Sequence, residues 1–342
     1  MEILGQFLNL SQPKVLNASL HLQKVSFSCI ALKSANRVKC CPQSQALLGV
    51  FMHYLSSICF VFACALSVAQ ASEGFQKGEG LPHLTPSKLV GVRFPKDTFG
   101  PITVAVVGYC PPPAILAKYE PIATTEQYFI HVPPSSVQIC RYGDLTFLSI
   151  YHVYGGPVSS ALIEELGYYG IKYVLAYGLA GGLGTKGLKM GDAYLVENAL
   201  SRDGTTIHYT EEPLIASDSD LNRTILELAK SNPELSEMVR VQAVTGDAIY
   251  REYDAELEEA IAQQCDVINC DSSHLFAVSN KVGIATTECG IVSDVIGSDK
   301  SEWDSTLSGI LSDRDDSATN PLERVGQIVE FYVEKLIPEL SN

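Results

Sequence analysis

Short apolar runs alternate with amphipathic segments along the chain after residue 80. Apolar or β-branched runs typical of buried strands occupy residues 102–108, 145–153, 172–175, 193–197, 239–244, 266–270 and 283–292. Apolar positions at helical spacing, with Ser, Asp, Gly or Pro at the first turn, predict helices over residues 155–170, 217–229, 255–262, 272–280 and 321–336. This alternation indicates one α/β domain of layered construction.

A glycine-rich run follows the strand predicted to end near residue 175. The segment 175–183 contains Gly178 and Gly181, and such a turn can bring backbone N–H groups close to an anion or a sugar. The same string is also typical of a tight turn that needs positive φ. Three further motifs follow predicted strands, at residues 202–205, 246–248 and 293–295. Ligand groups gather at the carboxyl ends of strands in such sheets, so we expect these segments to lie together.

The N-terminal 71 residues differ from the rest in charge. The first 45 hold five Lys or Arg and one acid, and residues 40–72 contain no charged side chain. The apolar part is short for a membrane span and ends in Ala69 and Ala71, which fit a cleavage site, so we predict a signal peptide over 52–71. Removal of this leader leaves a domain of residues 72–342 that is secreted or otherwise extracytoplasmic. A bipartite leader into an organelle lumen and a retained anchor are the alternatives.

Charge and cysteine content limit the partners of this domain. Subtracting the leader's five basic residues and one acid from the chain's 24 and 39 leaves 19 basic and 38 acidic residues, a net charge of −19. This argues against nucleic acid or an anionic membrane as a partner. Five cysteines without metal-ligand spacing remain, and we interpret them mainly as small buried residues, with one disulfide possible: Cys110, Cys140, Cys265, Cys270 and Cys289.

Several motifs together resemble one enzyme family. In chain order they are residues 155–157, 178–182 with 191–192, 202–205, 246–248 and 293–295. They are similar to the nucleoside phosphorylase/nucleosidase family, of the purine and uridine phosphorylase and methylthioadenosine nucleosidase type. The resemblance implies a single three-layer α/β domain with a mixed, partly barrel-like central sheet flanked by helices. It also implies a homo-oligomer with shared active sites.

The resemblance assigns the general acid to Asp294. A purine leaves poorly as an anion, so protonation near N7 lowers the barrier while the sugar becomes oxocarbenium-like. An ordinary Asp, with a pKa of about 3.9, is ionised at neutral pH, so the site must raise this pKa or share a proton with the base. The alternative role for an Asp in this position is a helix N-cap.

The resemblance also implies the substrate contacts. Cys270 and Asp271 align with a ribose-binding Met-Glu pair, so the carboxylate is retained but is one methylene shorter. Ile249 and Tyr250 align with residues that line the base, where an aromatic face suits stacking. Asp271 as a cap for the helix beginning at Ser272, and Tyr250 as core filling, are the alternatives.

Two further contacts follow from the resemblance. His83 matches an N-terminal histidine that reaches a neighbouring subunit's site near the sugar 5′ position, although a lone loop histidine is commonly just solvated. The amides around Gly178 and Gly181 are expected near the nucleophile. Both assignments make a small-molecule nucleoside the partner.

The positions expected to bind phosphate are all apolar. Leu116 and Ala176 stand where two arginines are expected, and Leu179 replaces a hydroxyl residue. Pro113 stands near the place of the glutamate that activates water in the hydrolytic branch. Removing charged donors leaves only backbone dipoles for a dianion. Four cations could substitute, and the sequence selects none of them: Lys118, Arg141, Arg251 and Lys300.

Two functions therefore stay open. The first is cleavage of the N-glycosidic bond of a purine-type nucleoside by phosphorolysis or hydrolysis, with no cofactor or metal and with phosphate as a possible co-substrate. The second is a catalytically impaired family member that binds or stores nucleosides, because fold and function are separable. A dinucleotide-binding domain is disfavoured, since the G-x-G-x-x-G spacing is absent.

Overall fold

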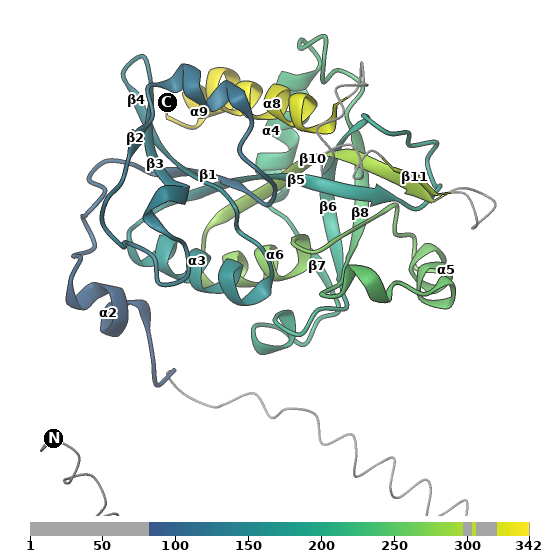
Figure 1. The fold of residues 1–342 in the computed structure, drawn as a ribbon, viewed down its shortest axis with the longest axis horizontal. Coiled ribbons are helices and arrows are strands. Elements are labelled where there is room, and N and C mark those ends of the chain that lie inside the picture. Colours follow the sequence, from purple (N-terminus) through teal and green to yellow (C-terminus); the bar gives the residue numbers. More distant parts are fainter. Residues whose placement is uncertain (1–81, 297–302, 306–319, 342) are drawn as a thin grey trace, which may run out of the picture. The chain divides into compact units, whose positions relative to one another are not determined.

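A mixed β-sheet forms the centre of the molecule (Figure 1). The computed structural model describes residues 82–296, 303–305 and 320–341, so the predicted leader lies outside the described residues. The strands are β1 (Val104–Gly108), β2 (Ile122–Ala123), β3 (Val137–Tyr142), β4 (Leu145–Ile150), β5 (Tyr173–Gly182), β6 (Ala193–Ser201), β7 (Leu214–Ala216), β8 (Val239–Thr245), β9 (Val267–Asn269), β10 (Ala285–Ile296) and β11 (Trp303–Ser305).

Part of this sheet closes on itself. The order β10-β6-β8-β9-β5 returns to β10 through a long parallel pairing with β5, so these five strands form a barrel. The sheet continues from β5 through β1, β4 and β3 to β2, while β11 pairs antiparallel with the far end of β10. The partly barrel-like sheet implied by the family resemblance is confirmed.

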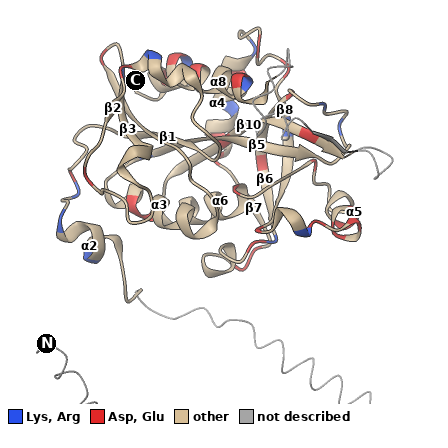
Figure 2. Cartoon of the chain, in the orientation of Figure 1, with Lys and Arg blue, Asp and Glu red and all other residues tan. Residues whose placement is uncertain are grey.

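Helices cover both faces of the sheet, which gives the three layers. The helices are α2 (Pro86–Leu89), α3 (Gly156–Tyr168), α4 (Ser219–Ala229), α5 (Asp254–Ala262), α6 (Ser272–Val282), α8 (Pro321–Phe331) and α9 (Ile337–Leu340). Figure 1 shows α3 and α6 on one face and α4, α8 and α9 on the other. A π-helical turn, Tyr332–Leu336, joins α8 to α9. Acidic residues gather on α5 (Figure 2).

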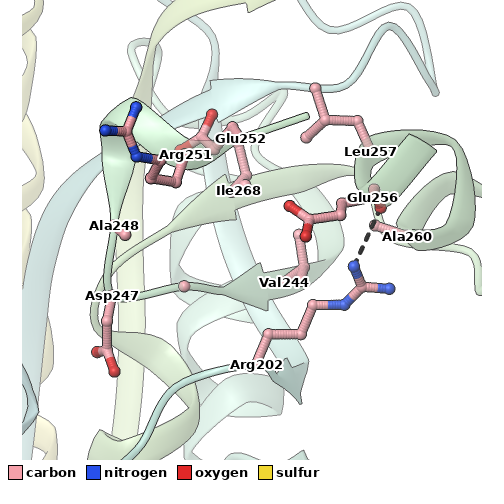
Figure 3. A pocket seen from close by; sticks show the side chains of 11 residues that line it. Arg202, Val244, Asp247, Ala248, Arg251, Glu252, Glu256, Leu257, Ala260 and Ile268 are labelled. Atoms are coloured by element: carbon pink, nitrogen blue, oxygen red, sulfur yellow. Dashed lines mark hydrogen bonds between the residues drawn. The ribbon is translucent and has the colours of Figure 1, made fainter. Parts of the chain in front are cut away.

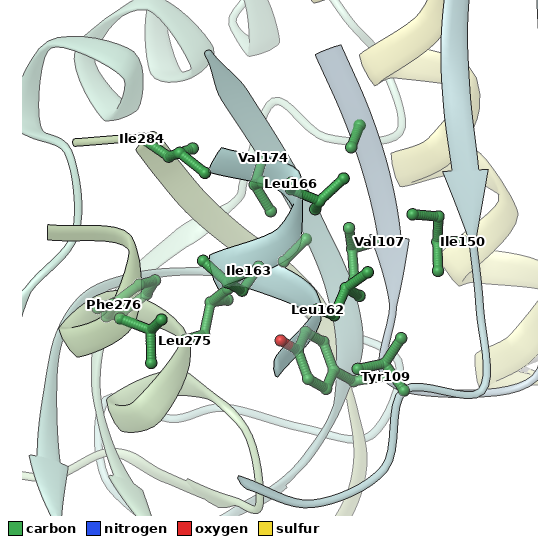
Figure 4. Packing of buried hydrophobic residues seen from close by; sticks show 14 of the residues in the cluster. Val107, Tyr109, Ile150, Leu162, Ile163, Leu166, Val174, Leu275, Phe276 and Ile284 are labelled. Carbon is green, nitrogen blue, oxygen red and sulfur yellow. The ribbon is translucent and has the colours of Figure 1, made fainter. Parts of the chain in front are cut away.

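Apolar side chains fill the space between the sheet and each helical layer. On one face Leu162 and Leu166 of α3 and Phe276 of α6 pack with Val107 of β1 and Val174 of β5 (Figure 4). These five side chains are at most 1% exposed, and each such burial stabilises the fold by about 1.5–3 kcal/mol. A second cluster lies under α4 and α8 on the opposite face. The apolar positions whose helical spacing predicted these helices are therefore the ones that pack against the sheet.

The glycine-rich run is a strand rather than a turn. β5 continues through Gly182 in register with β10, and neither Gly178 nor Gly181 has a positive φ. Glycine is required there by close neighbours: a Cβ on Gly178 would lie 2.9 Å from Asp271 Oδ2, and one on Gly181 would lie 3.0 Å from Asp294 Oδ2. This run was predicted to be a turn, either one that binds an anion or a sugar or a tight turn with positive φ. Both predictions are wrong about the local geometry. The backbone of this run belongs to the sheet.

The five cysteines after residue 71 are all free, and every one except Cys270 is buried. This agrees with their interpretation as small buried residues.

Among residues 82–296, 303–305 and 320–341, no helix has the length and apolar character needed to cross a membrane.

Candidate active site

One edge of β5 carries a break in strand pairing. β1 pairs with this edge as far as Tyr177, and β9 pairs with it from Gly181 onward. Residues 178–180 lie between the two ends. Tyr109, directly after β1, and Asp271, just after β9, both approach Gly178 there. Diverging strand ends are where sheets of this class bind ligands.

Asp294 lies on β10 opposite this part of β5. It pairs in register with Gly181, and the ladder shifts by one residue between Val292 and Asp294. Such bulges re-aim a side chain and are common beside active sites. Ser293 Oγ lies 2.6 Å from Asp294 Oδ1 and 3.3 Å from the carbonyl oxygen of Ala180, and the shorter contact orients the half-buried carboxylate. Asp294 is part of a strand, so its alternative role as a helix N-cap is wrong.

A cavity of about 210 Å³ lies beside the carboxyl ends of β8 and β9, under α5 (Figure 3). Its wall combines apolar side chains with arginines and carboxylates: Arg202, Val244, Gly246, Asp247, Ala248, Arg251, Glu252, Glu256, Leu257, Ala260 and Ile268. Arg202 is held at the wall, because it donates to the carbonyl oxygen of Glu256 and lies 3.1 Å from Glu259 Oε2. The mixture of apolar and polar groups suits a small heterocycle better than a bare anion.

Glu252 connects this cavity to Asp294. Burial raises the pKa of Glu252 above its ordinary value, and the nearby charge of Asp294 raises it further. Asp294 itself does not line the cavity. A Cβ on Gly181 would lie 3.0 Å from Asp294 Oδ2 and 3.2 Å from Cγ2 of Ile268, which does line it, so Asp294 lies one residue behind the cavity wall.

Asp271 is turned into the protein. Its side chain is 5% exposed, its Oδ1 accepts a hydrogen bond from the backbone N–H of Cys270 at 2.8 Å, and it makes no capping bond to α6. Asp271 occupies the N-cap position of α6, but its side chain does not cap the helix. Burial raises the pKa of Asp271 well above its ordinary value, and the neighbouring Glu288 raises it further. A contact to sugar hydroxyls requires this buried carboxyl to become accessible to a ligand.

The other predicted substrate contacts are spread more widely. Cys270 is half-buried and adjoins Asp271, whereas Ile249 and Tyr250, on a 3₁₀ turn, are 55% and 90% exposed. The chain by itself does not bring these two side chains to the cavity, and Tyr250 is not core filling. His83 is exposed before α2, with its backbone oxygen accepting from Lys88. Its reach into a second subunit stays a prediction, as does the oligomer.

The three residues at the positions expected to bind phosphate are apolar, and the structure buries them fully or in part. Leu116, in the 3₁₀ helix that follows β1, is 4% exposed, and Ala176 in β5 is wholly buried. Leu179 is half-buried. No charged donor stands at any of these three places.

The candidate substitute cations are mostly engaged elsewhere. Lys118 lies 2.8 Å from Glu330 and 2.5 Å from Glu334, and Arg141 is paired with Glu120. Arg251 lines the cavity and donates to the carbonyl oxygen of Tyr250. Lys300 lies outside the described residues. Among the three cations that the structure describes, only Arg251 lies beside the cavity.

Two buried acids were missed from the sequence. Glu288 is a lone acid inside the strand predicted over 283–292, and Asp203 lies in the motif at residues 202–205. An acid in an otherwise apolar strand was the available signal for Glu288. Both are 5% exposed or less.

Asp203 anchors its loop to α6. Its carboxylate accepts from the backbone N–H groups of Thr205 and Thr206, both at 2.8 Å, and from the hydroxyls of Ser201, Thr206 and Ser273. Burial opposes ionisation, but the hydrogen bonds from Ser273 and Thr206 prevail and lower the pKa of Asp203.

We expect Asp203→Asn to lower the free energy of unfolding by about 2 kcal/mol at pH 7, because donors to a charged acceptor lose their partner. A lowered folded pKa means that the stabilisation is present above the unfolded pKa of about 3.9 and is lost as pH falls through the folded value. Urea unfolding at pH 7 and at pH 3 should therefore show the gap between wild type and variant closing in acid. An equal gap at both values would contradict this assignment.

The sequence matches one known family and one viral protein over more than half of its length. Residues 106–334 match the family described as the phosphorylase superfamily. An uncharacterised protein of Acanthamoeba polyphaga mimivirus is 30% identical over 237 residues, covering 69% of this chain and 92% of that protein.

Solved structures share the fold. Purine nucleoside phosphorylase from Toxoplasma gondii, in complex with immucillin-H, has a TM-score of 0.53 at 24% identity, covering 78% of this chain and 99% of that one. The 5′-methylthioadenosine/S-adenosyl homocysteine nucleosidase of Campylobacter jejuni has a TM-score of 0.51 at 16% identity, covering 70% and 98%. A futalosine hydrolase mutant of Helicobacter pylori has a TM-score of 0.52 at 14% identity, covering 68% of this chain and 99% of that one.

Proposed function

Because the chain belongs to the phosphorylase superfamily, we propose that it cleaves the N-glycosidic bond of a purine-type nucleoside, with Asp294 protonating the departing base. Family and fold support nucleoside glycosidic cleavage in general. The observation that supports the finer proposal is the position of Asp294, on a bulged strand opposite Gly181, where Gly181 separates it from the cavity-lining Ile268.

The chemistry needs one proton and one sugar contact from this chain. As the bond between C1′ and the base breaks, the base gains negative charge and the sugar gains positive charge. Asp294 gives a proton to the base, which is worth about 10²–10⁴-fold in rate for a general acid. A water molecule adds to C1′ and releases a proton, which restores Asp294 to its acid form. Asp271, once ionised and turned toward the bound sugar, accepts hydrogen bonds from the sugar hydroxyls. Ser293 holds the Asp294 carboxylate in place for the transfer.

We expect release of the base to be independent of phosphate. Leu116, Ala176 and Leu179 supply no charged donor where an attacking phosphate would bind. The measurement is chromatographic product analysis with inosine, adenosine, methylthioadenosine and uridine, each with and without phosphate. Free purine in both conditions, and none from uridine, is the expected result. Release that requires phosphate would reverse the expectation, and no base from any nucleoside would remove the proposed activity.

The same apolar positions favour one second candidate. A family member that lost its anion ligands while keeping its glycines could bind or store nucleosides without cleaving them. Calorimetric titration with inosine separates the two functions, because binding without any product supports storage and binding with product supports the enzyme.

A further inference from the structure

The buried acid Glu288 lies against Asp271, and the two carboxyl groups face the same spot. Glu288 is wholly buried in β10, and Asp271 follows β9. A Cβ placed on Gly178 would lie 2.9 Å from Asp271 Oδ2 and 3.5 Å from Glu288 Oε1. The two acids therefore converge on Gly178, a position in β5 that has no side chain to separate them.

The hydrogen bonds around the pair are unequal. Glu288 Oε2 accepts from the Ser272 hydroxyl at 2.6 Å, and its Oε1 accepts from the Asn269 side-chain amide at 3.2 Å. Asp271 Oδ2 is buried and receives no hydrogen bond from any donor in the described part of the chain. Donors on Glu288 favour its charged form, and the bare oxygen of Asp271 favours a neutral acid there.

No cation compensates the pair in the part of the chain that the structure describes. His274, three residues after Asp271 in α6, is wholly buried, and burial lowers its pKa, so it is neutral at pH 7. Six other titratable groups interact with the pair from the surrounding elements: Tyr109, Cys110, Tyr194, Cys270, Cys289 and Tyr332. All six are phenols or thiols whose pKa values are raised by burial, so they are neutral at pH 7. Two ionised carboxylates cannot share such a site, because burial and mutual repulsion both oppose it.

We propose that Asp271 and Glu288 hold one proton between them at neutral pH, and that Glu288, as its acceptor, keeps the Asp271 carboxyl turned into the protein. The proton resides on Asp271 Oδ2 and bonds to Glu288 Oε1. Glu288 is then a positioning residue for the sugar contact, an aspect that rests on the proposed function. A nucleoside sugar that binds Asp271 must draw this carboxyl away from Glu288 as a carboxylate, and the shared proton then stays on Glu288.

Protein stability tests the shared proton without any nucleoside. An unfolded chain ionises both acids above pH 5, whereas the folded protein keeps one proton, so rising pH favours unfolding. From pH 6 to pH 8 the folding equilibrium constant of the wild type should fall with pH, by about tenfold per pH unit more than that of Glu288→Gln. The variant has a shallower slope because its amide donates to an ionised Asp271, so the folded variant holds no extra proton. The shared proton belongs to both acids, so Asp271→Asn and the double variant should each show the same shallow slope as Glu288→Gln.

A merely structural role for Glu288 gives a different result. Glu288→Gln would then be less stable than wild type at every pH with a parallel curve, and this outcome would overturn the proposal. Where a variant fails to fold, infrared spectra of the wild type decide. A protonated carboxyl band at pH 7 that shifts on isotopic labelling of aspartate supports the proposal, and its absence removes it. If the pair passes these tests while no nucleoside is cleaved, only the proposed function fails.

Discussion

Replacing Asp294 by asparagine is expected to lower the rate of base release by about 10²–10⁴-fold while leaving the fold intact. The amide has the same shape and can keep the contact with Ser293, but it has no acidic proton to give to the departing base. Because the loss occurs in the bond-breaking step, kcat should fall and the nucleoside KM should change little. Initial rates with inosine and a circular dichroism spectrum of the variant measure both parts.

Glu252→Gln is the matched control for this experiment. Glu252 is the neighbouring carboxyl on the cavity wall, and its pKa is raised by burial and by Asp294. If Asp294 is the acid, the Glu252 variant keeps most of the activity. The reverse pattern, with Asp294→Asn active and Glu252→Gln inactive, would transfer the role of acid to Glu252.

Gly290→Ala is expected to reduce the free energy of unfolding by at least about 3 kcal/mol. Its Cβ would lie 2.2 Å from the hydroxyl oxygen and 2.3 Å from ring carbon Cζ of Tyr194, and 2.7 Å from the carbonyl oxygen of Gly178. Tyr194 is wholly buried and the carbonyl belongs to β5, so neither can move without disturbing the barrel. Urea unfolding measures the loss.

Gly246→Ala serves as the control for this prediction. A Cβ on Gly246 meets no heavy atom within 4 Å, and its φ is not positive. We expect this variant to stay within about 1 kcal/mol of the wild type. A Gly290 variant as stable as the Gly246 variant would mean that the barrel accommodates the added methyl group.

Periodicity was enough to predict most of the fold. Helices α4 and α6 begin within two residues of their predicted starts, and Asp218 caps α4 by accepting from two backbone N–H groups. The strand-helix alternation carried this information because each buried face leaves a repeating pattern. The strand over Val137–Tyr142 was missed, since its apolar and polar positions mix at an edge hairpin.

The glycine-rich run shows where local pattern is insufficient. Glycines in sequence indicate positive φ or a close neighbour, and only the tertiary structure tells which. A side chain at Gly178 would collide with the carboxyl group of Asp271, and one at Gly181 with that of Asp294. These acids lie about 90 and 110 positions later in the chain. No spacing rule within the run could have indicated that.

The candidate site was predicted in part. Motif order located Asp294 and Asp271, but the inward turn of Asp271 depends on Glu288, whose partnership requires the pairing of β10 with β5. The exposure of Tyr250 likewise depends on surroundings that a single sequence does not define. Residue identity therefore indicated candidate groups, whereas how these groups face one another required the tertiary structure.

The antiparallel pairing of β11 with the end of β10 has an optical consequence. It aligns Ser305 with Asp294 and Trp303 with Ile296, and Trp303 is the one tryptophan of the chain. Ultraviolet emission excited at the indole absorption edge therefore originates from a single residue, whose backbone pairs two register positions away from the acid. Changes at this end of the sheet can be followed by native fluorescence, with no dye attached and no residue exchanged.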